Sequence, residues 1–244
     1  ILFPLEEPSS KVSEAYRALR TSLSFLSAER PVRIVQITSA TTGEGKTTVV
    51  ANLVVALAHA GQRVAAVSCD LRRPWLHQFF LATNEVGLSS ALAGQLAATD
   101  VLQPVAADGR ISLLASGPIP PNPAELLGTR RAEQAIQAIA SLVDVVVLDC
   151  PPVLPVTDAL VLADATILVA ATGVSSKRQV RRAVDVLHQA GAPIVGTVLM
   201  DVTGEDTYHY EESYEPPRPR RREGRRQAAR ASSSEPDLRA ASSG

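Results

Sequence analysis

The hydrophobic positions near the start of the chain follow a helical period. Within residues 10–27, apolar residues recur at intervals of four and three positions, which is typical of one face of an amphipathic helix. The charged residues Glu14, Arg17 and Arg20 fall on the opposite face. The pattern therefore predicts a helix over residues 10–27, and the proline-containing residues 1–9 ahead of it are predicted to form a linker.

Beyond Pro31 the pattern alternates between short apolar runs and longer segments with a helical period. Several of the short runs are apolar throughout, which is typical of strands covered on both faces. This alternation predicts an α/β fold, a three-layer sandwich in which a mostly parallel central sheet lies between helices. We predict strands over residues 32–38, 64–67, 111–115, 143–148, 165–171 and 194–199, and helices over residues 46–60, 124–142 and around 180–187, with a short helix opening near Gly87.

The periodic patterns stop at Gly204. Pro, Arg, Ser and Ala dominate residues 216–244, and a segment of this composition cannot bury enough apolar surface to offset the entropy lost on ordering. We therefore divide the chain into an N-terminal linker and helix (residues 1–28), an α/β domain (residues 29–203) and a tail predicted to be disordered (residues 204–244).

Composition and charge constrain the partners. The chain is 45% hydrophobic and 20% charged with a net charge of −1, so bulk electrostatics give no support for a nucleic-acid partner, and none is predicted. The charge is uneven, because residues 201–215 hold six acids and no Lys or Arg, whereas residues 218–239 hold eight arginines. The arginine-rich stretch either contacts anionic lipid or polyphosphate, or simply keeps the tail soluble.

Neither the cysteines nor the apolar runs indicate a secreted or membrane-spanning protein. Cys69 and Cys150 are the only cysteines, and both lie in apolar runs, so we expect reduced thiols rather than a disulfide framework or a zinc site. The apolar runs are shorter than the ~20 residues that span a bilayer, and no signal peptide is visible. Because Met200 is the only methionine, we expect further sequence ahead of Ile1, such as a membrane anchor.

The sharpest motif, over residues 40–47, reads Ala-Thr-Thr-Gly-Glu-Gly-Lys-Thr and matches the Walker A sequence of P-loop NTPases. Its glycines let the loop wrap so that N–H groups point at phosphate oxygens, Lys46 reaches the β and γ phosphates, and the Thr47 hydroxyl ligates Mg²⁺. The motif follows a predicted strand and opens a predicted helix, as this chemistry requires, which favours it over a glycine turn with a solvated lysine. The predicted nucleotide-binding residues are Thr42, Gly43, Glu44, Gly45, Lys46, Thr47 and Thr48.

Two acids follow predicted strands and are candidates for the metal site. Asp149 ends the run 143–148 and fits a Walker B acid, although an Asp in this position is often only a turn former. Asp70 follows a second apolar run and precedes Arg72, which either contacts phosphate or is part of an ordinary strand-to-loop junction. We predict ATP and Mg²⁺ as cofactors, with Thr47, Asp70 and Asp149 at the metal and Lys46, Asp70, Asp149 and Arg72 as catalytic residues.

Taken together, the motifs resemble those of the bacterial tyrosine kinases that regulate capsule and exopolysaccharide export. Five segments within residues 9–203 carry the resemblance, namely 13–21, the Walker A motif, 70–74, 117–127 and 149–152. The related partitioning and cell-division ATPases usually lack the proline-rich segment 117–127, and they place a second lysine at the position of Thr41.

The resemblance implies ATP-dependent phosphorylation of tyrosine hydroxyls by a P-loop fold. It implies that Glu14, Arg17 and Arg20, which match the family's E-x-x-R-x-x-R pattern, help to form a ring-shaped homo-oligomer, whereas their spacing alone indicates a solvated helix face. It also implies a location on the cytoplasmic face of the bacterial membrane. The implied partners are a chain-length-control or activator segment, fused upstream or supplied separately, and a tyrosine phosphatase.

Three of the four tyrosines cluster in the acidic part of the tail. Tyr208, Tyr210 and Tyr214 are the predicted phosphoacceptors, reached in trans by a neighbouring subunit, unless the tail has no specific role. Tyr16 lies on the apolar face of the first predicted helix and is predicted to be in the core. Each phosphate would add about −1.5 to −2 charge, and we expect the resulting repulsion to loosen the ring.

Two positions depart from the family pattern. The second acidic motif of the family reads Asp-x-Asp, whereas this chain has Ser68 at the first position. Because serine is no general base at neutral pH, proton acceptance falls to Asp70 or Asp149, or activity is low. The last strand often ends in an Asn that hydrogen-bonds adenine, whereas here it ends in Met200.

Two rival functions remain open from the sequence. One is a partitioning-type ATPase switch, against which Thr41 and the tail tyrosines argue. The other is a weakly catalytic, ATP-binding scaffold that regulates polysaccharide assembly, which Ser68 and Met200 favour.

Overall fold

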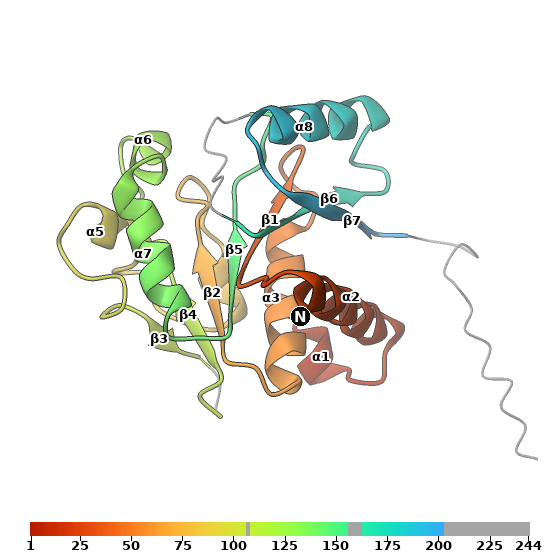
Figure 1. Cartoon of the computed structure of the whole chain (residues 1–244), viewed down its shortest axis with the longest axis horizontal. Coiled ribbons are helices and arrows are strands. Elements are labelled where there is room, and N and C mark those ends of the chain that lie inside the picture. Colours follow the sequence, from red (N-terminus) through yellow and green to blue (C-terminus); the bar gives the residue numbers. More distant parts are fainter. Residues whose placement is uncertain (106–107, 156–162, 203–244) are drawn as a thin grey trace, which may run out of the picture. The chain divides into compact units, whose positions relative to one another are not determined.

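A mostly parallel sheet forms the centre of the molecule. The computed structural model describes residues 1–105, 108–155 and 163–202, which belong to one compact unit. Its strands lie in the order β3-β4-β2-β5-β1-β6-β7, and all neighbours are parallel except β3 and β4 (Figure 1). The strands are β1 (Ile34–Ser39), β2 (Val64–Ser68), β3 (Gln103–Pro104), β4 (Ile111–Leu114), β5 (Val145–Asp149), β6 (Ala165–Ala171) and β7 (Ile194–Met200).

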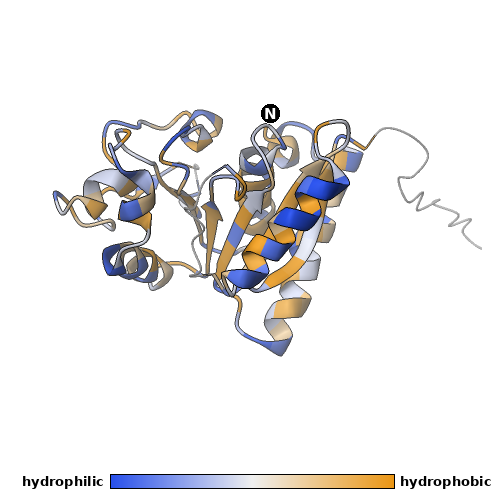
Figure 2. Cartoon of the chain, turned by 90° about the horizontal axis from the view of Figure 1, so that it is seen from above, coloured by the Kyte–Doolittle hydropathy of each residue, from blue (hydrophilic) through white to orange (hydrophobic). Residues whose placement is uncertain are grey.

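Helices cover both faces of this sheet, which confirms the predicted α/β sandwich. Helices α2 and α3 pack on one face, and α7 and α8 pack on the other (Figure 1). Hydrophobic and hydrophilic residues alternate along the surface helices, as expected for elements with one side in the core (Figure 2). The helices are α1 (Phe3–Glu6), α2 (Lys11–Glu29), α3 (Lys46–His59), α4 (Leu76–Phe79), α5 (Leu88–Leu92), α6 (Pro123–Leu127), α7 (Arg130–Ala140) and α8 (Lys177–Gln189).

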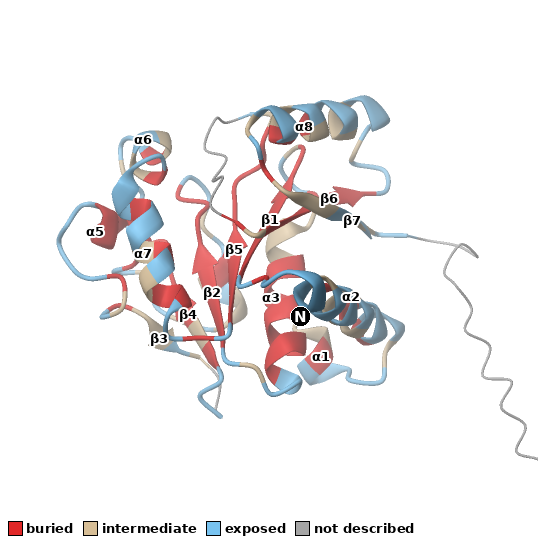
Figure 3. Ribbon diagram, in the orientation of Figure 1, coloured by how far each residue is buried: buried red, intermediate tan, exposed pale blue. Residues whose placement is uncertain are grey.

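The central strands are buried on both faces because successive side chains point to opposite sides of the sheet. In β5, Val147 packs with α3, whereas Val146 and Leu148 pack with Ile136 of α7. Every residue of β1, β2 and β5 is buried (Figure 3). The predicted strands over residues 32–38, 64–67 and 143–148 are therefore confirmed, with bounds that differ by one or two residues.

The predicted single helix over residues 124–142 is wrong, because the structure has two helices there. Helix α6 ends at Leu127, and α7 begins at Arg130 after Gly128 and Thr129. The Thr129 hydroxyl accepts a hydrogen bond from the Ala132 N–H at 3.3 Å, and so caps the second helix. The prediction joined the apolar residues on either side of residues 128–131 into one helix and overlooked the cap signal of Gly128 and Thr129.

The amino-terminal residues are packed rather than forming a simple linker. Helix α1 lies against α3, Pro4 is buried, and the Phe3 N–H donates to Asn52 Oδ1 at 2.7 Å. One helical turn is too short to show a period, which explains why the sequence did not reveal it; the same holds for α4 and the two-residue strand β3. Tyr16 is buried as predicted, and burial raises its pKa to about 12.

Within the described ranges, no helix combines the length and the hydrophobicity that crossing a bilayer requires. The predicted disordered tail and its tyrosines lie outside the described residues.

The cap at Thr129 gives a test of the local structure. Thr129→Ala should lower the free energy of unfolding by about 1 kcal/mol, because an N-terminal N–H of α7 loses its side-chain acceptor. Urea denaturation followed by circular dichroism measures this change. Ser9→Ala, which removes an exposed hydroxyl, should stay within about 0.5 kcal/mol of the wild type. Equal effects of the two substitutions would contradict the capping role.

Candidate active site

The candidate site residues meet where three parallel strands end. The Walker A loop follows β1, Asp70 follows β2, and Asp149 is the last residue of β5. The strand register places Asp149 beside both Ile37 of β1 and Ser68 of β2. Open α/β sheets bind their ligands at this carboxyl edge, so the topology alone brings the sequence-predicted residues together.

Two glycines give the Walker A loop its shape. Gly43 and Gly45 have φ angles of 82° and 87°, in the left-handed region where only glycine is unstrained. Gly45 is the N-cap of α3, so the helix begins at Lys46 with its unpaired N–H groups at the carboxyl edge of the sheet. The amino end of such a helix favours bound anions, as the motif predicts.

Lys46 forms an ion pair with Asp70. Its Nζ lies 3.1 Å from Asp70 Oδ2, and both side chains are largely buried. Asp70 Oδ1 accepts the Arg73 N–H at 3.0 Å, which fixes the carboxylate beneath the lysine. Arg72, predicted to be catalytic, lies two residues beyond Asp70 and is exposed.

The second acid contacts the first turn of α3. The Thr47 hydroxyl donates to Asp149, with distances of 2.9 Å to Oδ2 and 3.2 Å to Oδ1. Burial raises the pKa of Asp149 to about 6; Lys46 and Thr47 oppose the shift, and Asp70 adds to it. A cation placed beside this carboxylate would favour its charged form and remove much of the burial effect.

Ser68 lies beside Asp149, where the resemblance leads one to expect an acid. It is fully buried, and its hydroxyl has no hydrogen-bond partner among the described residues.

The oxygens of Thr47, Asp70, Asp149 and Ser68 are the hard donors that Mg²⁺ prefers. In the described part of the chain, no cluster of three or more His, Cys, Asp or Glu forms a metal cage. Such a sparse set suits Mg²⁺, which usually takes its remaining ligands from water and substrate phosphates.

Two contacts of the loop could not be foreseen from the motif. Glu44 is buried, and its carboxylate accepts hydrogen bonds from the Thr41 N–H and from the Ser175 hydroxyl. A β-carbon added to Gly45 would lie 3.3 Å from Met200 Cγ and Cε, so the methionine packs directly against the loop. No spacing pattern identifies Ser175, because a serine just ahead of a helix is ordinary.

The remaining nucleotide-binding and oligomerisation candidates are accessible. Thr42 and Gly43 are exposed at the tip of the loop, and Thr48 is half-buried. Glu14 and Arg17 pair with each other on the exposed side of α2, while Arg20 donates to the Ala56 carbonyl at 3.4 Å. The role of Glu14, Arg17 and Arg20 in a ring stays a prediction.

The cysteines flank the two acids. Cys69 precedes Asp70 and Cys150 follows Asp149, and both thiols are free and buried. Hydrogen bonding to Cys69, together with burial, raises the pKa of the Cys150 thiol. A thiol whose pKa is raised stays protonated and is a poor nucleophile, so Cys150 acts as a small apolar group.

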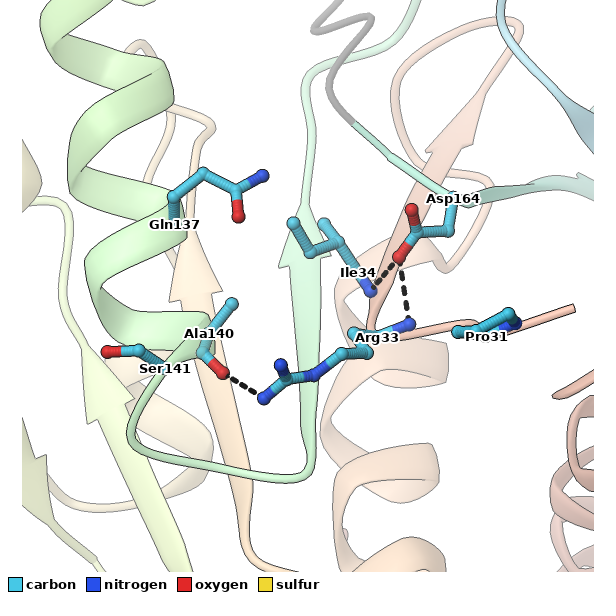
Figure 4. A pocket seen from close by; sticks show the side chains of 7 residues that line it. All are labelled: Pro31, Arg33, Ile34, Gln137, Ala140, Ser141 and Asp164. Carbon is cyan, nitrogen blue, oxygen red and sulfur yellow. Dashed lines mark hydrogen bonds between the residues drawn. The ribbon is translucent and has the colours of Figure 1, made fainter.

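A pocket of about 260 Å³ at the opposite, amino edge of the sheet has no part in this site (Figure 4). Its Arg33 side chain donates to the carbonyls of Ala140 and Val143, and Asp164 accepts the N–H groups of Arg33 and Ile34. These bonds occupy its charged groups, which leaves little to recognise a ligand.

Comparison of the sequence with known proteins identifies the family to which this chain belongs. The family model described as the CobQ/CobB/MinD/ParA nucleotide binding domain matches residues 35–216. Tyrosine-protein kinase YwqD of Bacillus subtilis is 38% identical over 198 residues, which cover 80% of this chain and 83% of that protein. Tyrosine-protein kinase etk of Escherichia coli K12 is 37% identical over 201 residues, which cover 81% of this chain but only 28% of that longer protein.

Solved structures agree. The kinase domain of the Escherichia coli tyrosine kinase ETK superposes with a TM-score of 0.79 at 34% identity, covering 86% of this chain and 85% of that one. The septum site-determining protein MinD from Pyrococcus horikoshii, complexed with Mg-ADP, gives a TM-score of 0.59 at 29% identity, covering 68% of this chain and 69% of that one.

Because Asp149 is buried, the free energy of unfolding should depend on pH. Its folded-state pKa of about 6 lies above the ~3.9 of a free aspartate, so the folded protein holds this proton more tightly than the unfolded chain does. Ionisation therefore destabilises the metal-free fold above pH 6, and this penalty disappears below pH ~4. Asp149→Asn should raise the free energy of unfolding at pH 8 by on the order of 2 kcal/mol and leave it unchanged near pH 4.

Denaturation of the metal-free wild type and variant across this pH range measures the effect. Asp144→Asn is the control, because Asp144 is exposed and its pKa is lowered by Arg63, so that substitution should not stabilise the protein. An Asp149→Asn variant less stable than the wild type at pH 8 would count against the burial argument.

Proposed function

This chain belongs to the bacterial tyrosine-protein kinases and carries the CobQ/CobB/MinD/ParA nucleotide binding domain, and from that premise we propose how it acts. It transfers the γ-phosphoryl group of ATP to Tyr208, Tyr210 and Tyr214 of an adjacent copy. This modification regulates the polymerisation and export of a capsule or exopolysaccharide. The observation that carries the proposal is the pairing of Lys46 with Asp70 and of Thr47 with Asp149 at one edge of the sheet.

Magnesium fits the proposed site. Thr47, Asp70 and Asp149 would hold it directly or through water, and the unpartnered Ser68 hydroxyl could bond one of its waters. The ion would supply charge neutralisation between the β and γ phosphates. The Mg-ADP in the MinD structure supports this assignment.

The lysine has two alternative partners. Lys46 is paired with Asp70 at 3.1 Å. A bound triphosphate competes for the same ammonium group, and the transfer of Lys46 to phosphate frees Asp70. The freed carboxylate can then bind a metal-bound water or accept the proton of the incoming tyrosine hydroxyl.

The proposed assembly extends beyond this site. Glu14, Arg17 and Arg20 on α2 would contact a neighbouring subunit in a ring, on the cytoplasmic face of the bacterial membrane. A membrane chain-length-control or activator segment, fused upstream or supplied separately, and a tyrosine phosphatase complete the set of partners. The greater length of the Escherichia coli relative supports an additional segment in that protein.

One observation favours slow catalysis. Ser68 provides a neutral hydroxyl next to Asp149, so the site has one carboxylate fewer than the family pattern to attract the metal and the acceptor proton. A weakly catalytic, ATP-binding scaffold is therefore the second candidate function.

Incubation of the purified protein with MgATP tests the proposal. We expect phosphotyrosine at residues 208, 210 and 214, detected by mass spectrometry, and none in Lys46→Met, because that substitution removes the charge that holds the phosphates. Release of ADP without phosphotyrosine would instead support the ATPase switch. Binding of ATP with neither product would support the scaffold.

Restoring the acid at position 68 should accelerate the reaction. Ser68→Asp places a carboxylate beside Asp149, and we expect about a tenfold higher rate of autophosphorylation at saturating Mg²⁺. Ser68→Asn has nearly the same shape without the charge and serves as the matched control. If both variants gained equally, or neither did, charge at this position would not be what limits the rate.

A further inference from the structure

The Glu44 side chain connects the Walker A loop to the segment between β6 and α8. Its Oε2 accepts a hydrogen bond from the Thr41 N–H at 2.6 Å, and its Oε1 accepts one from the Ser175 hydroxyl, 131 residues away in the sequence. Ser175 Oγ in turn accepts the N–H of Ala171, the last residue of β6, at 2.8 Å. The bonds therefore join the loop to a fixed strand end.

The surroundings of Glu44 exclude a direct chemical role. The residue is only 1% exposed, and both carboxylate oxygens accept bonds from neutral donors. A carboxylate turned toward the phosphates would repel them. The Glu44 carboxylate is instead buried and bonded to Thr41 and Ser175, so it is placed neither as a metal ligand nor as a proton acceptor.

The Glu44 contacts matter for the loop because the two neighbouring glycines place little restriction on its backbone. Gly43 and Gly45 flank Glu44, both have positive φ, and a β-carbon on Gly43 would meet nothing within 4 Å. Glycines lose more conformational entropy than other residues when they are fixed. Over residues 43–45 only Glu44 has a side chain that can hold the loop in one shape.

We propose that Glu44 and Ser175 form a brace that holds the Walker A loop in its phosphate-binding shape before the nucleotide arrives. Ser175 is then a positioning residue. The inference rests on the proposed function, because it assumes that the loop binds a nucleoside triphosphate. A loop that is already ordered loses less entropy on binding, so the brace increases affinity. It favours bound substrate and transition state equally, and its loss should therefore raise KM and leave kcat unchanged.

Ser175→Ala tests the brace. The Kd for MgADP, measured by calorimetry, and the KM for ATP should both rise about fivefold, the size of effect expected from losing the hydrogen bond to Glu44, with kcat unchanged. Ser175→Thr retains the hydroxyl and should restore nucleotide affinity. Thr172→Ala removes an exposed hydroxyl from the same segment and is the matched control, expected to bind as the wild type does.

A double-mutant cycle with Glu44→Ala isolates the contact itself. Glu44→Ala combined with Ser175→Ala should bind MgADP no more weakly than Glu44→Ala alone. The reason is that Glu44→Ala has already removed the acceptor to which the Ser175 hydroxyl donates. In the unliganded protein, hydrogen exchange at residues 41–46 should be faster in Ser175→Ala than in Thr172→Ala. This readout reports the loop even if the overall stability of a variant falls.

The outcomes separate the brace from the proposed function. Wild-type protein that binds MgADP, with Ser175→Ala unchanged in Kd or additive with Glu44→Ala, overturns the brace and leaves the kinase proposal intact. A fall in kcat at constant KM also overturns it. A folded wild type that binds no nucleotide overturns the proposed function itself.

Discussion

The charge balance at the carboxyl edge of the sheet depends on one ammonium group, that of Lys46. Lys46 is the cation that offsets two buried acids, pairing with Asp70 directly and lowering the pKa of Asp149 through space. Buried carboxylates without such a partner would take up protons or destabilise the fold. The same ammonium is what a triphosphate would bind, so nucleotide arrival rearranges the charge balance of the whole edge. Stability without ligand and affinity for ligand therefore depend on the same atom.

The fold serves this edge by fixing the loop from several sides. Strand β1 delivers the loop from the centre of the sheet, α3 begins where it ends, Met200 packs against Gly45, and Ser175 bonds to Glu44. The arrangement is that of a site organised mainly by the packed core behind it.

The sequence predicts the parts of the structure that depend on repeated local physics. Apolar β-branched runs mark the buried strands, and β6 has the predicted bounds, because a strand covered on both faces tolerates few polar residues. The meeting of Lys46, Asp70 and Asp149 also follows, since parallel strands of an α/β sheet end at one edge.

The features that could not be predicted from the sequence each depend on a single contact or on its absence. The break at Thr129 depends on one hydroxyl, and the contact of Ser175 with Glu44 joins residues far apart in the chain. The unpartnered state of the Ser68 hydroxyl likewise reflects three-dimensional surroundings, and no spacing pattern encodes them.

The packing of the amino terminus against α3 connects the start of the chain to the helix that begins at the Walker A loop. Asn52 accepts the Phe3 N–H and donates, at 2.9 Å, to the carbonyl of Thr48, which lies two residues beyond Lys46. Asn52 therefore links α1 to the first turn of α3, which also carries Lys46 and Thr47. Removing that one amide side chain would break both bonds at once.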